Sequence, residues 1–382
     1  MKSAAGTSRN LFRNFDLDRG LTLCVLMLMG IGLVAVYSAS FVFASEKYGD
    51  GLFFFKKQIV FVVLATFVLW LVSHFPYQLF KKYFWIFLAV EVVALLLVFV
   101  PGLAYRAGGA SRWISLPGGL HFEPSELAKL MAPIAIGFLM TRKRWRDEKW
   151  WQTVLIYVLS LLVPIFIMLR QPDFGSSAII AIVCLTVLFC FGLKWGYFVV
   201  AGLIAVPAFY FLVVRVPYRF KRIEAFLNPW TDPSESGFQV IQSLLSFFNG
   251  GFWGTGLGKG QGKLFFLPEA HTDFILAVLG EETGFIGLIA VFALYSWLVL
   301  RGLQISIECN EPFGKKIALG MTALVGFQAV INGGVVLGLL PTKGLTMPFL
   351  SYGGSSLIAM TAACGVLLNI HRQNLLQRNG SR

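Results

Sequence analysis

The sequence predicts an all-α polytopic membrane protein with about ten transmembrane helices. Of its 382 residues, 57% are hydrophobic and only 13% are charged, and 37 are phenylalanine. The mean hydropathy is +0.73, whereas a typical soluble domain has about 25% charged residues. Apolar runs also reach about 17–25 residues, the length that a bilayer-spanning helix requires. The sequence shows no separate soluble domain, so residues 1–382 are interpreted as a single integral membrane domain.

The apolar runs place the spans in order along the chain. We predict them at 21–42, 58–75, 84–101, 124–140, 153–170, 176–193, 197–214, 274–300, 317–340 and 353–370. More than half of the 32 Lys and Arg residues fall in the segments that are internal if the N-terminus is cytoplasmic. Both termini are therefore predicted to be cytoplasmic, and the one long loop, 215–273, is extracytoplasmic.

The net charge of +13 follows from this topology. Basic residues near the spans attract anionic lipid headgroups, so membrane lipid is the expected partner and nucleic acid is not. The first span is long enough to remain as an uncleaved anchor. The five cysteines lack metal-ligand spacing and read as small buried hydrophobes.

The outer loop at 101–130 contains the first candidate binding residues. Arg112 stands beside Trp113, and this pair fits either a phosphate site or an interfacial anchor. Lys129 follows Glu126 by three residues, so both lie on one face of the fourth span. Lys129 is interpreted as a structural partner of Glu126, as a pyrophosphate ligand, or as both.

Isolated acids occur elsewhere in the chain. Glu91 lies within the third span and faces either a functional cavity or another helix. Asp173 follows the fifth span, where it caps the next helix or orients a cation. In the long loop, the basic and aromatic run 215–222 suits an interfacial helix against anionic lipid or pyrophosphate, and the glycine-rich stretch 250–262 reads as a flexible flap.

A polar cluster precedes the eighth span. Thr272 or Asp273 can cap that span, but Glu269, His271 and Asp273 together exceed what one cap needs. A carboxylate at this boundary is well placed to act on a lipid-linked substrate. Glu281 and Glu282 lie deeper and are interpreted as structural partners of cations or helix ends. The stretch 339–357, which contains Lys343, has the prolines and glycines of a broken segment that lines a cavity.

These motifs together resemble the SEDS family (shape, elongation, division and sporulation proteins) over nearly the whole chain. The resemblance rests on SRWI at 111–114, EPSELAKL at 123–130, QPDFG at 171–175, NPWTDP at 228–233, LPEAHTDFI at 267–275 and PTKGLTMPFLSYGGSS at 341–356. The last three motifs look more like the division members than the elongation members. Glu123 departs from the family pattern, which usually has Gln at this position.

The resemblance implies a peptidoglycan glycosyltransferase that polymerises lipid II at the outer face of the bacterial cytoplasmic membrane, at the division septum. It implies Asp273 as the catalytic carboxylate and Arg112, Lys129 and Lys343 as cations of the substrate cavity. Glu269, His271 and Asp173 complete the predicted substrate-binding set. A divalent cation, Mg²⁺ or Mn²⁺, is an expected cofactor, although no ligands are assigned to it. The expected partners are a class B penicillin-binding protein and other division proteins.

Two other functions remain open from the sequence. A lipid II flippase would use the same cations and broken helices, but its polar path must continue to the inner face. A scaffold that recruits the transpeptidase would leave the polar cluster at 269–273 unexplained.

Overall fold

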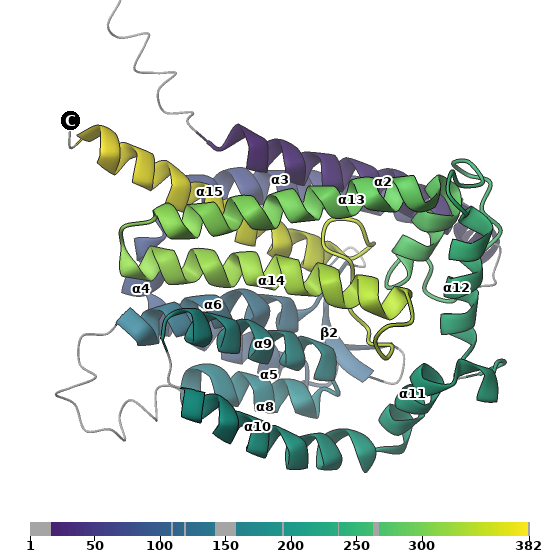
Figure 1. The fold of residues 1–382 in the computed structure, drawn as a ribbon, viewed down its shortest axis with the longest axis horizontal. Coiled ribbons are helices and arrows are strands. Elements are labelled where there is room, and N and C mark those ends of the chain that lie inside the picture. The colour runs from purple at the N-terminus through teal and green to yellow at the C-terminus, as the bar shows by residue number, and fades with distance from the viewer. Residues whose placement is uncertain are drawn as a thin grey trace, which may run out of the picture.

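The structure, a computed structural model, is a bundle of roughly parallel helices (Figure 1). It describes residues 17–107, 110–117, 120–141, 158–192, 195–235, 237–262 and 267–380. The predicted inner loop at 141–152 and Lys194 lie almost entirely outside these residues, as does the predicted glycine turn at 108–109. The beginning of α2 and the end of α15 lie at the same end of the bundle.

Described helices lie within all the predicted spans, and the short α4 lies between the second and third spans. In chain order the helices are α2 (Arg19–Tyr48), α3 (Phe53–His74), α4 (Gln78–Lys82), α5 (Phe84–Leu97), α6 (Pro124–Thr141), α8 (Val163–Arg170), α9 (Phe174–Cys190), α10 (Trp195–Phe209), α13 (Ile275–Glu308), α14 (Pro312–Val336) and α15 (Gly354–Gly380). Short π-helical turns, Val158–Leu162 and Tyr210–Val214, precede α8 and follow α10. Among the described residues, α2, α3, α13, α14 and α15 are long and apolar enough to cross a membrane, and α5, α8 with the turn before it, and α9 are shorter apolar helices.

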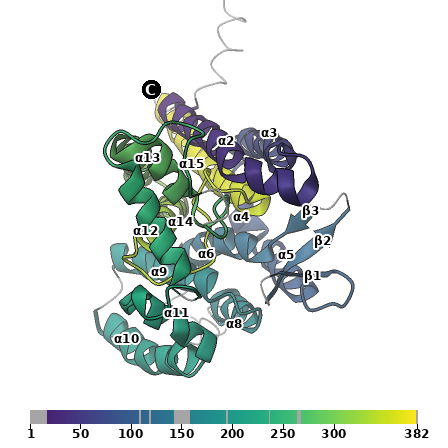
Figure 2. The ribbon, with the colours of Figure 1, turned by 90° about the vertical axis from the view of Figure 1, so that its right-hand side faces the viewer.

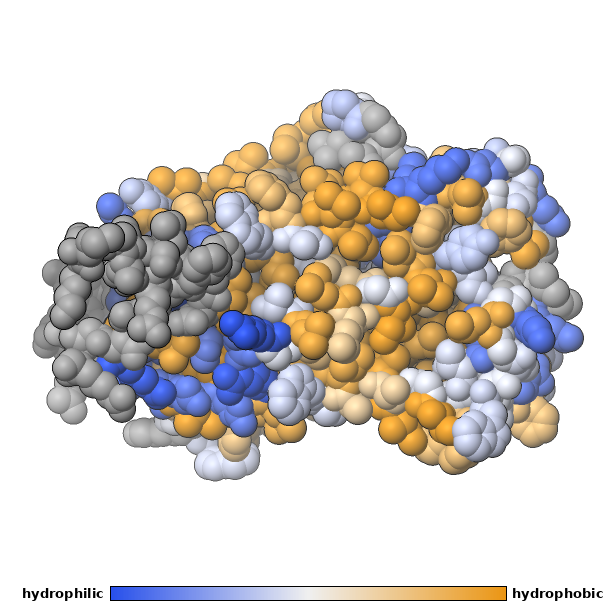
Figure 3. Space-filling model, turned by 90° about the horizontal axis from the view of Figure 1, so that it is seen from above, coloured by the Kyte–Doolittle hydropathy of each residue, from blue (hydrophilic) through white to orange (hydrophobic). Residues whose placement is uncertain are grey.

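The core lies around α14, which packs against α13, α6, α9 and α15. Most of the apolar stretch of α14 is buried inside the bundle, whereas α3 exposes most of its own. Figure 3 shows the corresponding surface: hydrophobic residues cover the middle of the face, and hydrophilic residues gather toward the two ends. Exposed leucine, valine and phenylalanine side chains on α2, α3 and α5 form part of the apolar surface, as lipid contact requires.

The outer loop after α5 differs from the all-α prediction. It forms a three-stranded antiparallel sheet of β1 (Ala104–Ala107), β2 (Ala110–Leu116) and β3 (Leu120–Phe122), in the order β1-β2-β3. Tyr105 pairs with Trp113, and Ile114 pairs with Phe122. The strands are too short to give a clear alternating pattern, and glycine pairs separate them in the sequence. The sheet fixes Arg112 on a rigid strand.

The long loop after α10 contains helices α11 (Pro217–Leu227) and α12 (Phe238–Gly250), with a short 3₁₀ turn, Pro229–Thr231, between them. Both helices run across one end of the bundle, and Figure 2 shows them on the side away from the sheet. The glycine-rich stretch after α12 is not the free flap that the sequence predicts. Residues 251–256 are hydrogen-bonded to the backbone of α13.

Candidate functional site

A cavity of about 590 Å³ opens among α9, α10, α11 and the stretch after α14. Its polar lining includes four cationic side chains, Arg112, Arg219, Arg222 and Lys343, together with Asp173. Apolar side chains of α10 and α11, namely Phe209, Ile223, Phe226 and Leu227, form much of the remaining wall. The cavity therefore combines positive charge with an apolar wall, as an anion on a lipid chain requires.

Arg112 is held at this cavity by backbone carbonyls. Its Nε donates to the carbonyl of Gln171 at 3.4 Å and its Nη2 to that of Pro172 at 2.6 Å. Neighbouring residues of a strand point to opposite faces, and Trp113 packs edge-to-face with Tyr105 on the sheet. Arg112 and Trp113 therefore point to opposite faces of the sheet and do not form one phosphate-binding pair.

Asp273 adjoins the cavity at Gly344. A Cβ atom on Gly344 would lie 3.7 Å from Oδ2 of Asp273 and 3.7 Å from Nη1 of Arg112. The absence of a side chain at this position leaves a gap between the carboxylate and the guanidinium. Asn332 fixes the backbone around the gap, because its Nδ2 donates to the carbonyls of Asp273 at 2.9 Å and of Leu345 at 2.6 Å.

Neither Thr272 nor Asp273 caps α13, so the capping alternative does not hold. The residue at its N-cap is Phe274, and no side chain there accepts a hydrogen bond from the helix. The chain instead makes a turn in which the carbonyl of Glu269 accepts from the N–H groups of Thr272 and Phe274. The Thr272 hydroxyl also donates to Glu269 Oε2 at 2.8 Å. The Asp273 carboxylate therefore makes no cap hydrogen bond, and it faces Gly344 at the edge of the cavity.

Burial raises the pKa of Asp273 to about 7, and the nearby charge of Glu269 adds to this effect, while Arg222 and Arg112 oppose it. A carboxyl group with this pKa exchanges its proton near neutral pH, as a general base must. Lys343 is also affected by its surroundings, because burial lowers its pKa.

His271 lies in an aromatic cluster and does not line the cavity. Its ring lies 4.6 Å from that of Phe54 and 5.8 Å from those of Phe43 and Tyr352, between centroids. Burial lowers its pKa, Glu269 opposes this effect, and Lys47 adds to it. The His271 carbonyl accepts from the N–H of Tyr352 at 2.9 Å. His271 therefore joins the turn before α13 to the stretch after α14.

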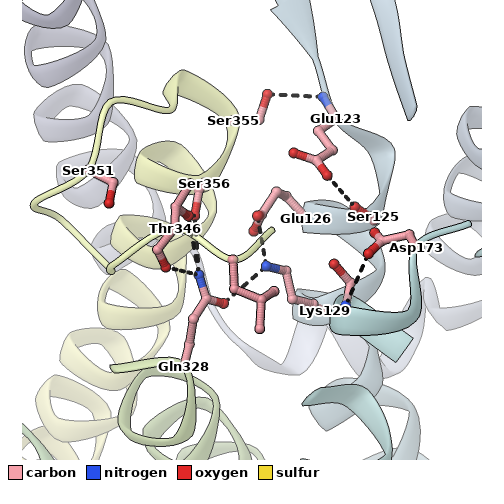
Figure 4. Close-up of polar contacts among 12 residues, drawn as sticks. Glu123, Ser125, Glu126, Lys129, Asp173, Gln328, Thr346, Ser351, Ser355 and Ser356 are labelled. Atoms are coloured by element: carbon pink, nitrogen blue, oxygen red, sulfur yellow. Dashed lines mark hydrogen bonds and ion pairs between the residues drawn. The ribbon is translucent and has the colours of Figure 1, made fainter. Parts of the chain in front are cut away.

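Lys129 belongs to a buried polar network, shown in Figure 4. The side chain is 1% exposed, and Nζ donates to Glu126 Oε1 at 2.7 Å and to Gln328 Oε1 at 3.0 Å. Gln328 Nε2 in turn donates to the carbonyl of Thr346 at 3.1 Å. The predicted Glu126 partner is confirmed. Lys129 does not line the cavity, and it stabilises the interior beside it.

Glu123 stands at the edge of this network (Figure 4). Its N–H donates to the Ser355 hydroxyl at 3.0 Å, and Oε1 accepts from Ser125 at 3.1 Å. Burial, with the charges of Glu126 and Asp173, raises the pKa of Glu123 to about 8 against the opposing effects of Lys129 and Ser125. Its carboxyl is thus largely protonated at neutral pH and adds no full negative charge beside Lys129.

Asp173 caps α9, as the sequence predicts, because its Oδ1 accepts from the N–H of Ser176 at 3.2 Å. Its other oxygen, Oδ2, is buried and has no hydrogen-bond partner within the described ranges. Asp173 is among the residues that line the cavity, although Oδ2 itself is closed off from it.

Arg219 and Arg222 are the cavity cations that the predicted site omits. They are three residues apart on α11, and residues at this spacing share a helix face. Arg219 and Lys343 both lie over the ring of Phe174, at 5.6 Å from its centroid. Arg222 donates to the carbonyl of Thr342 at 3.3 Å. The spacing in the run 217–227 signals a common face, but not which cavity that face meets.

A family model described as "Cell cycle protein", which covers the FtsW, RodA and SpoVE proteins, matches residues 19–375. The chain belongs to this family. A Geobacter sulfurreducens member, named probable peptidoglycan glycosyltransferase FtsW, is 44% identical over 92% of this chain and 94% of its own length. Stage V sporulation protein E of Bacillus subtilis is 38% identical over 93% of this chain and 97% of its own length.

Solved structures of family members have the same fold. A chain from a study of how a peptidoglycan synthase complex coordinates polymerization and crosslinking superposes with a TM-score of 0.74, at 29% identity, and covers 94% of this chain and 99% of its own length. The crystal structure of the rod shape determining protein RodA of Thermus thermophilus has a TM-score of 0.68, at 27% identity, and covers 94% and 98%.

Among the residues of this chain that the structure describes, no group of three or more His, Cys, Asp or Glu side chains could hold a metal ion. The cavity itself contributes one carboxylate, Asp173, and Asp273 adjoins it. These residues do not form a complete binding site for a resident divalent ion.

Proposed function

We propose that this protein is a peptidoglycan glycosyltransferase that polymerises lipid II into glycan strands. The observation that carries the proposal is the cavity with four cations beside Asp273, whose pKa is about 7. Relatives that match nearly the whole chain are named as probable enzymes of this kind. Lipid II presents a disaccharide, a pyrophosphate and a prenyl chain, which need polar, cationic and apolar surfaces respectively.

The reaction joins an acceptor sugar hydroxyl to the anomeric carbon of a second lipid-linked sugar. A carbon–oxygen bond forms there while the bond to the lipid pyrophosphate breaks, and the leaving group keeps the electron pair. Asp273 accepts the proton of the attacking hydroxyl, because its carboxylate and acid forms are both populated near neutral pH. One base without a second catalytic carboxylate suits transfer to a sugar better than hydrolysis.

Arg112, Arg222 and Lys343 stabilise the departing pyrophosphate. Arg112 is oriented by the carbonyls of Gln171 and Pro172, with Nη1 directed to the gap at Gly344. Preorganised cations that face a developing anion lower the barrier without reorganising. The apolar residues of α10 and α11 provide a surface for the first part of the prenyl chain. Glu269, His271 and Lys129 act indirectly, through the turn before Asp273 and the interior beside the cavity.

A divalent cation, Mg²⁺ or Mn²⁺, remains a proposed cofactor for the pyrophosphate. Magnesium is commonly bound by one or two carboxylates together with substrate phosphates, and the described carboxylates do not form a cage of their own. Such an ion would arrive with the substrate, and no step above depends on it.

We also propose ten membrane spans, since described helical structure lies within each predicted span, and cytoplasmic termini, since most Lys and Arg residues then fall in the inner segments. The cavity, α11 and α12 then lie at the outer face, where lipid II is polymerised. We further propose that a class B penicillin-binding protein and other division proteins bind the chain at the septum, since its relatives include FtsW proteins and a chain of a peptidoglycan synthase complex.

A flippase requires a polar path from the cavity to the inner face. In the part of the chain that is described, Lys129 is closed off by Glu126 and Gln328 within the bundle. No observation therefore favours transport over polymerisation.

The decisive test uses purified lipid II and the full-length protein with its transpeptidase partner. Wild type should form glycan strands, and Asp273→Ala and Asp273→Asn should not, at unchanged thermal stability. Strands formed equally by both variants would reject Asp273 as the base. Transport of labelled lipid II across liposomes without strand formation would replace the transferase with the flippase.

A further inference from the structure

Helix α13 is broken at Gly284, where φ is 67° and ψ is −167°. In an unbroken helix the N–H groups of Phe285 and Ile286 would bond to the carbonyls of Glu281 and Glu282. Here Phe285 donates to Gly251 at 3.0 Å and Ile286 to Phe252 at 3.4 Å. The two carbonyls accept instead from Thr255 at 2.9 Å and Gly256 at 3.0 Å.

Residues 251–256 therefore bridge the break: they provide hydrogen-bond partners for the two N–H groups and the two carbonyls that lose their partners within the helix. The fit requires glycine at 254, where φ is 81° and a Cβ atom would lie 2.2 Å from the carbonyl oxygen of Glu282. The break separates a first part of α13, 275–283, from the rest of the helix. That first part directly follows Asp273.

The side chain of Glu281 connects this part to the end of the glycine-rich stretch. Glu281 is 1% exposed, and its Oε1 accepts from the N–H of Gln261 at 2.8 Å while Oε2 accepts from that of Gly262 at 3.0 Å. The Gly262 carbonyl in turn accepts from the N–H of Leu267 at 3.0 Å. Leu267 begins the turn that leads to Asp273.

We propose that Glu281 is a positioning residue for Asp273. Its carboxylate clamps the 261–262 backbone, which fixes the start of the stretch 267–273, and Asn332 fixes the end of that stretch through the Asp273 carbonyl. The role of the clamp in catalysis rests on the proposed transferase function, but the clamp itself does not.

The chemistry of the clamp allows a sharp substitution. An ionised carboxylate accepts at both oxygens, and its hydrogen bonds to backbone N–H groups are charge-assisted. In Glu281→Gln one oxygen is replaced by an NH₂ group, which faces an N–H donor instead of accepting from it. The side chain keeps its size, so the packing is nearly unchanged.

Glu282→Gln is the matched control. Glu282 is the next residue and is 3% exposed, but its Oε1 accepts from the Ser38 hydroxyl of α2 at 2.5 Å. The same carboxylate-to-amide change is thus made one residue away, and the Glu281 hydrogen bonds to residues 261–262 are kept. Gly262→Ala disturbs the clamp from the other side, since its Cβ atom would lie 2.9 Å from Glu281 Oε2 and 2.6 Å from the Ser246 hydroxyl of α12.

The experiment combines hydrogen exchange with polymerisation kinetics, on the full-length protein in lipid nanodiscs. For Glu281→Gln and Gly262→Ala we expect exchange in 255–262 and at Leu267 to accelerate at least tenfold and kcat for lipid II to fall at least tenfold, with KM changed less than threefold. Glu282→Gln should keep the wild-type exchange and most of kcat.

Unchanged exchange in both clamp variants would overturn the clamp. Accelerated exchange with wild-type kcat would overturn its positioning role. A wild type that forms no glycan would contradict the transferase function by itself, and the exchange result would still decide whether Glu281 holds the stretch.

Discussion

Asp173 and Asp273 both stand just before a helix beside the same cavity, but the structure uses them differently. Asp173 Oδ1 accepts from the N–H of Ser176 at the N-terminus of α9. Asp273 caps no helix, because α13 begins two residues later, after the turn at Glu269. A carboxylate that caps a helix is held by its hydrogen bond to the helix N-terminus, whereas a carboxylate that caps no helix and lies beside cations can accept and release a proton.

The largest effect should separate these two aspartates. Asp273→Asn removes the proposed base and should lower the polymerisation rate by about 10²–10⁴-fold, the usual contribution of general base catalysis. Asp173→Asn keeps an oxygen that can cap α9, so its rate should fall by less than about tenfold. Lipid II polymerisation by both variants, at matched protein levels, checks this. Equal losses would show that the two residues do not differ in role.

Arg222→Gln tests the role of the cavity cations that lie near Asp273. The substitution removes one cavity charge that faces the departing pyrophosphate, which should lower kcat/KM for lipid II by about tenfold, in line with the loss of a charge-assisted contact in the transition state. Arg215→Gln, on an arginine that packs over Tyr210 and Phe211 and is not among the cavity-lining residues, is the matched control. A kcat/KM equal to that of the control would remove Arg222 from the substrate site.

The smallest effect concerns stability, where the order of the two aspartates should reverse. Asp173→Ala removes the cap of α9 and should destabilise the protein by about 1 kcal/mol, while Asp273→Ala, which removes no cap, should cost less. Thermal unfolding of the two variants in the same detergent measures the difference. A greater loss for Asp273→Ala would contradict the assignment of the caps.

The sequence predicts features that depend on local pattern. Span positions follow from apolar length, the Asp173 cap from an acid just before an apolar run, and the Glu126–Lys129 pair from its spacing on one helix face. The sheet at 104–122 is missed because its strands are short and closely spaced, with glycine pairs between them. The Asp273 cap, which the sequence leaves open, does not form because the turn at Glu269 delays the start of α13.

Contacts between distant segments are beyond such patterns. The meeting of Arg112, Arg222 and Lys343 requires a strand, α11 and the stretch after α14 to converge on one cavity. The sequence predicts a cation or a helix end as the partner of Glu281, yet its partners are two backbone N–H groups about twenty residues earlier in the chain, at Gln261 and Gly262. The packed structure alone identifies these partners.

The central claim is that Asp273 works as the base because its surroundings hold its pKa near 7. The most direct test is the pH–rate profile of polymerisation for wild type, Arg222→Gln and Glu269→Gln. Since the base acts when deprotonated, the wild-type rate should fall below a midpoint near pH 7, by up to about tenfold per pH unit.

Arg222 lowers the pKa of Asp273 and Glu269 raises it. The midpoint should therefore move up in Arg222→Gln and down in Glu269→Gln. A wild-type profile that stays flat from pH 5.5 to 8.5 (about three units across the expected midpoint), or a midpoint that neither substitution moves, would contradict Asp273 as the base.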